Sequence, residues 1–237
     1  MPTSSCNTAG TSTMEAQGSN NIRVLILANG DTPSRELAHR LARQHDLLIA
    51  TDGAVHQAAD LQLCPHIVCG DFDSALLERA QQDFPEAEFI ATPDQDHADL
   101  EKAIQVALSR GASRITVIGA TGGRLDFTLA NMALLLRYYT EVELQVVDDT
   151  TVVHVVGSET DRAGEVVLNA HPGERVSLLS LSGQARVSIS GVEWPLQDYP
   201  LPVGTRGVSN VAREPQVIVR ARRGAVLVFH FPGTFSP

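Results

Sequence analysis

An acidic cluster in the first half of the chain has the composition of a metal site. In the stretch Gly70-Asp71-Phe72-Asp73-Ser74, two carboxylates lie two residues apart directly after a short apolar run. Carboxylates this close repel each other unless a cation lies between them, and Mg²⁺ prefers a few carboxylate oxygens together with substrate phosphates. A loop that only caps the following helix fits this cluster equally well, so both interpretations stay open here.

A second acidic cluster follows at residues 94–101. Four acidic residues fall within these eight positions, at the start of a helical pattern. Helix capping and the helix dipole account for one or two of them, but not for this density. Asp96 and Asp99 are three residues apart and share a face if both are helical. We expect the two clusters to share one metal–phosphate site.

A glycine-rich loop, Gly119-Ala120-Thr121-Gly122-Gly123-Arg124-Leu125-Asp126, lies between an apolar run and a helical pattern. Glycines let backbone amides approach an anion, and the arginine fork grips phosphate. Such loops also occur without a ligand. The loop lacks the Gly-Lys-Ser/Thr ending of a Walker motif, and no GxGxxG follows the first strand, which argues against a dinucleotide oxidoreductase.

The only tryptophan, Trp194, lies in the second half of the chain. A lone tryptophan usually anchors a core or a turn. It can also form a stacking surface for a flat cationic ring. Spacing in the sequence does not decide between these roles.

The elements that must position these residues predict an α/β fold. From residue 21 to residue 148, short apolar runs alternate with helical patterns, which is typical of an N-terminal α/β domain with a mostly parallel sheet. The polar clusters follow apolar runs, where ligands bind in such folds. From residue 149 to residue 237, short strands separated by turns predict a C-terminal antiparallel β sandwich, with its last two strands at residues 216–220 and 225–231. Residues 1–20 are expected to be a disordered leader.

Composition narrows the classes of function. The 237-residue chain has a formal net charge of −10, which argues against a nucleic-acid partner and implies that bound phosphates need metal ions. No apolar run approaches the length of a membrane span, and the N-terminus lacks an apolar signal core. We therefore expect a cytoplasmic protein with no membrane partner.

Taken in order, the motifs resemble the thiamine pyrophosphokinase family from about residue 22 to the C-terminus. The matching stretches are DGA at 52–54, GDFDS at 70–74, DQDHADLEKAI at 94–104, GATGGRLD at 119–126, GVEWPL at 191–196 and GVSN at 207–210. The resemblance implies ATP and Mg²⁺ as requirements, AMP and thiamine diphosphate as products, and a homodimer with active sites at the subunit interface.

The resemblance also assigns roles to residues, by motif match. The implied catalytic residues are Asp71, Asp73, Asp99 and Arg124, and the implied magnesium ligands are Asp71, Asp73, Asp96 and Asp99. The nucleotide would be held by Asp52, Gly122, Gly123, Arg124 and Asp126. Thiamine would contact Gln95 of one subunit and Trp194, Ser209 and Asn210 of the other. Phe127 departs from the family pattern, which often has a polar residue there.

The expected reaction is in-line attack of the thiamine hydroxyl oxygen on the β-phosphorus of ATP, with AMP leaving. One alternative is a pyrophosphokinase for another alcohol, such as a hydroxymethylpterin, which would keep the first three clusters without a Trp194 pocket. Another is a sensor that binds thiamine or nucleotide without releasing AMP. A sensor leaves the repelling carboxylates unexplained.

Overall fold

Six parallel strands form the centre of the first half of the protein. The computed structural model describes residues 21–72, 74–158 and 164–233, with backbone only at residues 74–76. The predicted leader, residues 1–20, and Asp73 lie outside the described residues. The strands lie in the order β4 (Glu88–Ala91), β3 (Ile67–Gly70), β2 (Leu47–Thr51), β1 (Ile22–Leu27), β5 (Ala112–Ile118) and β6 (Glu143–Val147). The strand order reverses between β1 and β5, where ligands bind in such sheets.

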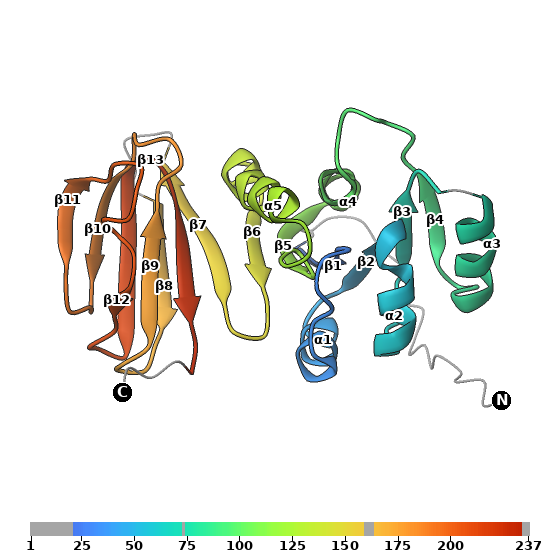
Figure 1. Ribbon diagram of the computed structural model, residues 1–237, viewed down its shortest axis with the longest axis horizontal. Coiled ribbons are helices and arrows are strands. Elements are labelled where there is room, and N and C mark those ends of the chain that lie inside the picture. The colour runs from blue at the N-terminus through green and yellow to red at the C-terminus, as the bar shows by residue number, and fades with distance from the viewer. Residues whose placement is uncertain (1–20, 73, 159–163, 234–237) are drawn as a thin grey trace.

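Helices cover both faces of this sheet, as Figure 1 shows. One face packs against α4 (Asp99–Ser109) and α5 (Leu125–Tyr138), through side chains such as Ile104 and Leu135. The other face packs against α1 (Arg35–Ala42), α2 (Val55–Leu61) and α3 (Ser74–Asp83), and the short 3₁₀ turn η1 (Asp52–Ala54) leads into α2. Burial on both faces explains why the strands are nearly continuous apolar runs.

The second half is antiparallel and continues the same sheet. Strand β7 (Val152–Ser158) pairs with β6 and with β13 (Gln216–Phe231). With β7 and the end of β13, strands β9 (Arg175–Leu179) and β12 (Asn210–Val211) form the first layer of a sandwich. The second layer consists of the start of β13 with β8 (Gly164–Asn169), β10 (Arg186–Ser190) and β11 (Leu196–Pro200). The predicted fold class is therefore confirmed. The domain boundary predicted between residues 148 and 149 falls in the turn between β6 and β7.

The two strands predicted at residues 216–220 and 225–231 are in fact one strand, and that prediction was wrong. The first part of β13 pairs with β8 and β10, and its last part pairs with β7 and β9. Arg222, Arg223 and Gly224 interrupt the apolar pattern at the bend, where Gly224 has a φ of 63°. The strand nevertheless keeps its ladder pairing on both sides of Gly224 while it passes from one layer to the other, as strands at sandwich corners do.

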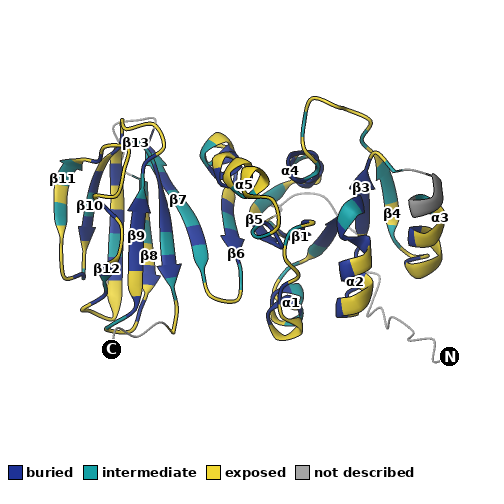
Figure 2. Ribbon diagram, in the orientation of Figure 1, coloured by how far each residue is buried: buried dark blue, intermediate teal, exposed yellow. Residues whose placement is uncertain are grey.

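Alternating burial along β13 forms the interior of the sandwich. Val217, Val219 and Ala221 are fully buried, whereas Gln216 before them and Arg220 between the last two are exposed (Figure 2). Strands β11 and β12 were not predicted because they are short and carry few apolar residues. Within the described part of the chain, no helix is both long and apolar enough to cross a membrane.

A buried carboxylate ties the end of β13 to the turn before β9. Glu174 is 2% exposed and accepts hydrogen bonds from the backbone N–H groups of His171 (3.0 Å) and Gly233 (2.8 Å). Its Oε2 also lies 2.8 Å from Nε2 of His230. Burial alone would raise the pKa of Glu174, but these hydrogen bonds outweigh it and lower the pKa to about 2.

This carboxylate should make the free energy of unfolding depend on pH in the acidic range. Because the pKa of Glu174 falls from 4.5 to about 2 on folding, its contribution is complete above pH 4.5 and is lost as the pH falls towards 2. We expect Glu174→Gln to remove about 3 kcal/mol of unfolding free energy at pH 7 and to flatten its pH dependence between those values. Urea unfolding at several pH values measures both, with exposed Glu214→Gln as the control. Parallel pH curves for Glu174→Gln and the wild type would contradict the assignment.

Candidate active site

Two loops meet at the point where the strand order reverses. The loop after β1 donates three backbone hydrogen bonds to β5 and the glycine-rich loop after it: Ala28 to Ile118 (2.9 Å), Gly30 to Gly119 (2.6 Å) and Asp31 to Thr121 (2.8 Å). These bonds hold the two loops side by side at the carboxyl ends of neighbouring strands. The sequence showed each loop separately but not this contact.

Glycine is required where the loops touch. A Cβ added to Gly30 would lie 2.3 Å from the carbonyl oxygen of Thr121 and 2.5 Å from that of Gly119. Gly119 and Gly122 have φ values of 67° and 81°, which side chains rarely allow. The glycines predicted to cradle an anion are therefore also needed to bring the two backbones together.

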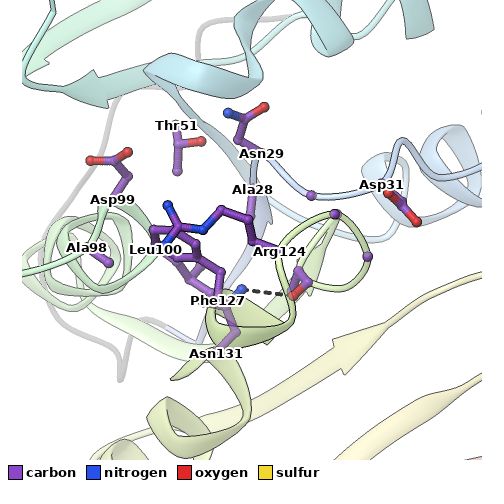
Figure 3. Close-up of a pocket in the computed structure, with 15 residues that line it drawn as sticks. Ala28, Asn29, Asp31, Thr51, Ala98, Asp99, Leu100, Arg124, Phe127 and Asn131 are labelled. Carbon is purple, nitrogen blue, oxygen red and sulfur yellow. Dashed lines mark hydrogen bonds between the residues drawn. The ribbon is translucent and has the colours of Figure 1, made fainter. Parts of the chain in front are cut away.

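A cavity of about 390 Å³ opens beside these loops. Its apolar wall includes Ala28, Leu100, Ala120 and Phe127, and its polar lining is Asn29, Asp31, Thr51, Asp99, Arg124 and Asn131, with Gly122 and Gly123 at the glycine-rich loop. The Nδ2 of Asn131 donates to the carbonyl oxygen of Ala120 (2.8 Å) and so fixes that loop from α5 (Figure 3). An apolar wall with a few converging polar groups is typical of a small-molecule site.

Arg124 is held on two sides. Its Nε donates to Oδ1 of Asp126 (3.1 Å), and its guanidinium carbon lies 4.5 Å from the centre of the Phe127 ring. Figure 3 shows the arginine side chain extending over Phe127 towards the side of the cavity where Asp99 lies. Phe127 therefore supplies a cation–π contact to Arg124. Asp126 does not line the cavity; its hydrogen bond with Arg124 lowers the pKa of its carboxyl group.

Three carboxylates that follow different strands interact electrostatically, and the interaction is centred on Asp52. Asp52, after β2, is 6% exposed and accepts from the backbone N–H groups of Gly53 (2.7 Å) and Phe72 (3.3 Å). Burial raises the pKa of Asp52, and the negative charges of Asp99 and Asp71 raise it further. Since like charges are being held close together, a cation bound here would relieve their repulsion.

The loop that carries Asp71 is strained. Phe72 has a φ of 36°, unusual for a residue with a side chain, and its ring packs 6.1 Å from that of Phe89. Gln95 donates from Nε2 to Asp71 (3.3 Å), and this hydrogen bond lowers the pKa of Asp71. Strained residues often occur where a side chain must point towards a ligand.

Asp96 is not brought to this cavity. It is exposed, and its backbone N–H donates to Oδ1 of Asp94 (2.8 Å). The side chain of Asp94 is in turn engaged by His97. Of the four predicted metal ligands, Asp99 lines the cavity, Asp71 acts electrostatically on the same cluster, and Asp73 lies outside the described residues.

The residues present fit a metal ion that is shared with a ligand. Across residues 21–72, 74–158 and 164–233, no group of three or more His, Cys, Asp or Glu side chains is arranged to hold a metal ion by itself. Mg²⁺ does not need such a group, since it usually keeps several waters and binds one or two carboxylates plus phosphate oxygens. Asp99, which lines the cavity, and Asp71, whose charge reaches Asp52 in the same cluster, offer carboxylates of that kind.

A second cavity of about 500 Å³ lies in the antiparallel half. Trp194, Ser209 and Asn210 line it together, as the resemblance implied, with Leu178, Ile189 and Arg206 among their neighbours. Trp194 is 54% exposed, so it is not a core anchor. Gln95, which was predicted to contact thiamine from the other subunit, lies with Asp71 in the first half of the chain.

The side chain of Asn210 holds the backbone of Trp194 through two hydrogen bonds. Its Oδ1 accepts from the backbone N–H of Trp194 (3.1 Å), and its Nδ2 donates to the carbonyl oxygen of Trp194 (2.7 Å). Ser209, with a φ of 61°, donates its N–H to the hydroxyl of Ser177 (3.0 Å). These bonds fix the loop that presents the indole ring at the cavity.

Comparisons with known proteins agree with this geometry. Residues 38–147 match the family model "Thiamin pyrophosphokinase, catalytic domain", and residues 165–226 match "Thiamin pyrophosphokinase, vitamin B1 binding domain". The chain is 33% identical to Thiamin pyrophosphokinase 1 of Caenorhabditis elegans over 144 residues, which are 56% of this chain and 58% of the relative. It is 24% identical to Thiamine pyrophosphokinase of Bacillus subtilis over 68% of this chain and 76% of the relative.

Solved structures share the fold. The thiamine pyrophosphokinase of Bacillus subtilis superposes with a TM-score of 0.73 at 20% identity, covering 89% of this chain and 99% of that one. The yeast thiamin pyrophosphokinase has a TM-score of 0.72 at 13% identity, with coverage of 90% and 86%.

The contact between the two loops can be tested with one methyl group. Gly30→Ala would place a Cβ against two backbone carbonyls that cannot move independently of the sheet. We expect a loss of about 2 kcal/mol in unfolding free energy, together with weaker nucleotide binding, because the loops must separate. Gly111→Ala is the control: it lies outside the cavity, its Cβ would meet no atom closer than 4.0 Å, and its left-handed φ of 80° is what opposes the change. Equal effects of the two variants on nucleotide binding would contradict the role of Gly30.

Proposed function

Because the chain belongs to the thiamin pyrophosphokinase family, we propose that it transfers pyrophosphate from ATP to the hydroxyl group of thiamine, giving thiamine diphosphate and AMP. The observation that carries this proposal is a pair of cavities. One joins carboxylates, an arginine and a glycine-rich loop, and the other is lined by an exposed tryptophan. In this proposal residues 21–148 form the ATP-binding catalytic domain, and residues 149–237 form the thiamine-binding domain.

ATP would occupy the first cavity. Its phosphates would lie against Gly122 and Gly123, where backbone N–H groups and the start of α5 favour negative charge, with Arg124 on a phosphate. Asp71, Asp73 and Asp99 would hold Mg²⁺, which when bound neutralises phosphate charge. Asp96 would join them only if its loop moves when the nucleotide binds.

The reaction asks mainly for positioning and charge neutralisation. The thiamine hydroxyl oxygen attacks the β-phosphorus of ATP in line. A new O–P bond forms as the bond between the β-phosphorus and the bridging oxygen breaks, and AMP leaves with that oxygen. The hydroxyl proton passes to a base near the cavity, and Asp99 is the catalytic carboxylate that lines it.

Thiamine would bind in the second cavity. Its thiazolium ring is flat and positively charged, and the exposed indole of Trp194 offers an aromatic face for it. A neutral ring such as that of a hydroxymethylpterin could stack on this surface but would gain no cation–π attraction, so Trp194 favours thiamine. A sensor without catalysis would not explain the crowded carboxylates around Asp52.

A homodimer would bring the two cavities together. They are formed by different halves of the molecule, which lie side by side along its long axis (Figure 1), and they share no residue. Exposed apolar side chains lie near both: Leu125 (73%) and Leu129 (57%) at the first, Val203 (64%) and Val208 (44%) at the second. Patches of this kind mark interaction sites. The need for ATP supports a cytoplasmic location, which is part of the same proposal.

The first experiment supplies the protein with ATP, Mg²⁺ and thiamine and separates the products by chromatography. We expect AMP and thiamine diphosphate in equal amounts. Asp71→Asn and Asp99→Asn should each lower kcat by about 100-fold or more, because each removes a charge that the transition state needs. Exposed Asp60→Asn is the matched control and should retain the wild-type rate. Turnover of a pterin alcohol in place of thiamine would overturn the substrate, and binding without AMP release would favour the sensor.

The shared active site predicts complementation between two defective chains. Asp99→Asn disables the catalytic half and Trp194→Ala the thiamine-binding half, so a mixed dimer has one intact site. We expect refolding the two variants together to restore about one quarter of wild-type activity at low thiamine, from random pairing in a two-fold dimer. A mixture of Asp99→Asn and Asp71→Asn should show no recovery, since both defects lie in the same half. Failure of the first mixture to recover would contradict the interface arrangement.

A further inference from the structure

Lys102, which the sequence did not single out, is buried beside the carboxylates. Its side chain is only 5% exposed, and its Nζ lies 3.4 Å from Oδ1 of Asp99, which is 47% exposed. That ion pair is the one side-chain polar contact that the described part of the chain gives the ammonium group. Lysine is almost never fully buried unless it is paired, because a desolvated charge is unfavourable. The position of Lys102 therefore needs a reason.

The surroundings of Lys102 are acidic. The pKa of Asp71 is lowered first by its hydrogen bond from Gln95 and then also by the positive charge of Lys102. Asp52 is close enough to Asp99 and Asp71 for their charges to raise its pKa. Arg124, the cation that lines the cavity, is already paired with Asp126. Lys102 thus supplies an internal positive charge to Asp99 and Asp71, two of these three carboxylates.

The neighbouring residue provides a contrast. Glu101 is also buried in the first turn of α4, but it points to α5, where its Oε1 lies 3.0 Å from the hydroxyl of Tyr138 and 3.0 Å from Nη1 of Arg137. Glu101 therefore joins two helices. Lys102 contacts a side chain that lines the cavity, so the same turn of α4 has one buried charge on each side.

We propose that Lys102 is a positioning residue for the reaction: its buried ammonium group holds the Asp99 carboxylate at the cavity and offsets the charge of Asp71 and Asp99 before metal and phosphate bind. The proposal rests on the proposed function for its effect on turnover. Its effect on the charge of the site does not depend on the identity of the substrate.

Replacing Lys102 with a neutral side chain of similar shape tests both its effect on turnover and its effect on the charge of the site. For Lys102→Met we expect kcat to fall by about 100-fold, with the KM for thiamine changed by less than about threefold, because orientation at the reacting phosphate is lost. We also expect Mn²⁺ alone to bind the nucleotide-free protein about tenfold more tightly, since a cation near the carboxylates has been removed. Electron paramagnetic resonance of Mn²⁺ measures the second effect. Lys102→Arg keeps the charge and should keep wild-type Mn²⁺ affinity.

Glu101→Gln is the matched control for a purely structural role. It should lower the melting temperature while leaving kcat and Mn²⁺ affinity within about twofold of wild type, because it weakens the contacts with α5 and with His97 and none with the carboxylates of the site. Should Lys102→Met fail to fold, Lys102→Gln is measured in the same way. A neutral variant of Lys102 that behaves like Glu101→Gln, or that leaves Mn²⁺ affinity unchanged or weaker, overturns the proposal. A wild-type protein without thiamine turnover overturns the proposed function alone, since the Mn²⁺ comparison still tests Lys102.

Discussion

The close contact between the loop after β1 and the loop after β5 is the constraint on which the active site depends. Three backbone hydrogen bonds join these loops, and Gly30 approaches two carbonyl oxygens at distances that exclude a Cβ. The contact is possible because β1 and β5 are neighbours at the point where the strand order reverses. It places the glycine-rich loop, and with it Arg124, beside the ends of β2 and β3, where the carboxylates lie.

Charge in this site is arranged in layers of decreasing burial. Asp52 is buried and closely bonded to backbone, Asp99 is half exposed at the cavity, and Arg124 is largely exposed. The buried groups keep their geometry without a ligand, whereas the exposed ones are free to exchange partners when phosphate arrives. This division is what a polyphosphate site needs, because the fixed charges are preorganised and the mobile ones neutralise the ligand.

Continuous hydrogen bonding from β6 through β7 to β13 joins the two halves of the chain. Because β13 also passes into the second layer of the sandwich, both layers are attached to the parallel sheet through one strand. Within one chain, the Trp194 cavity could close over the cavity proposed to bind ATP only if this ladder were broken. A second chain could bring its Trp194 cavity to this cavity while the ladder stays intact. This is the physical argument for an active site at a subunit interface.

The sequence by itself determined the elements and the chemistry. Apolar runs with polar clusters at their ends predicted the parallel sheet, and the types and order of the motif residues predicted a metal–phosphate site, because both signals are local. Only the tertiary structure decided which of those residues meet. It brought Asp99 and Arg124 to one cavity, left Asp96 in solvent, joined two predicted strands into β13, and buried Lys102 against Asp99. Contacts between segments far apart in the chain depend on strand order and helix packing, and neither spacing nor composition records them.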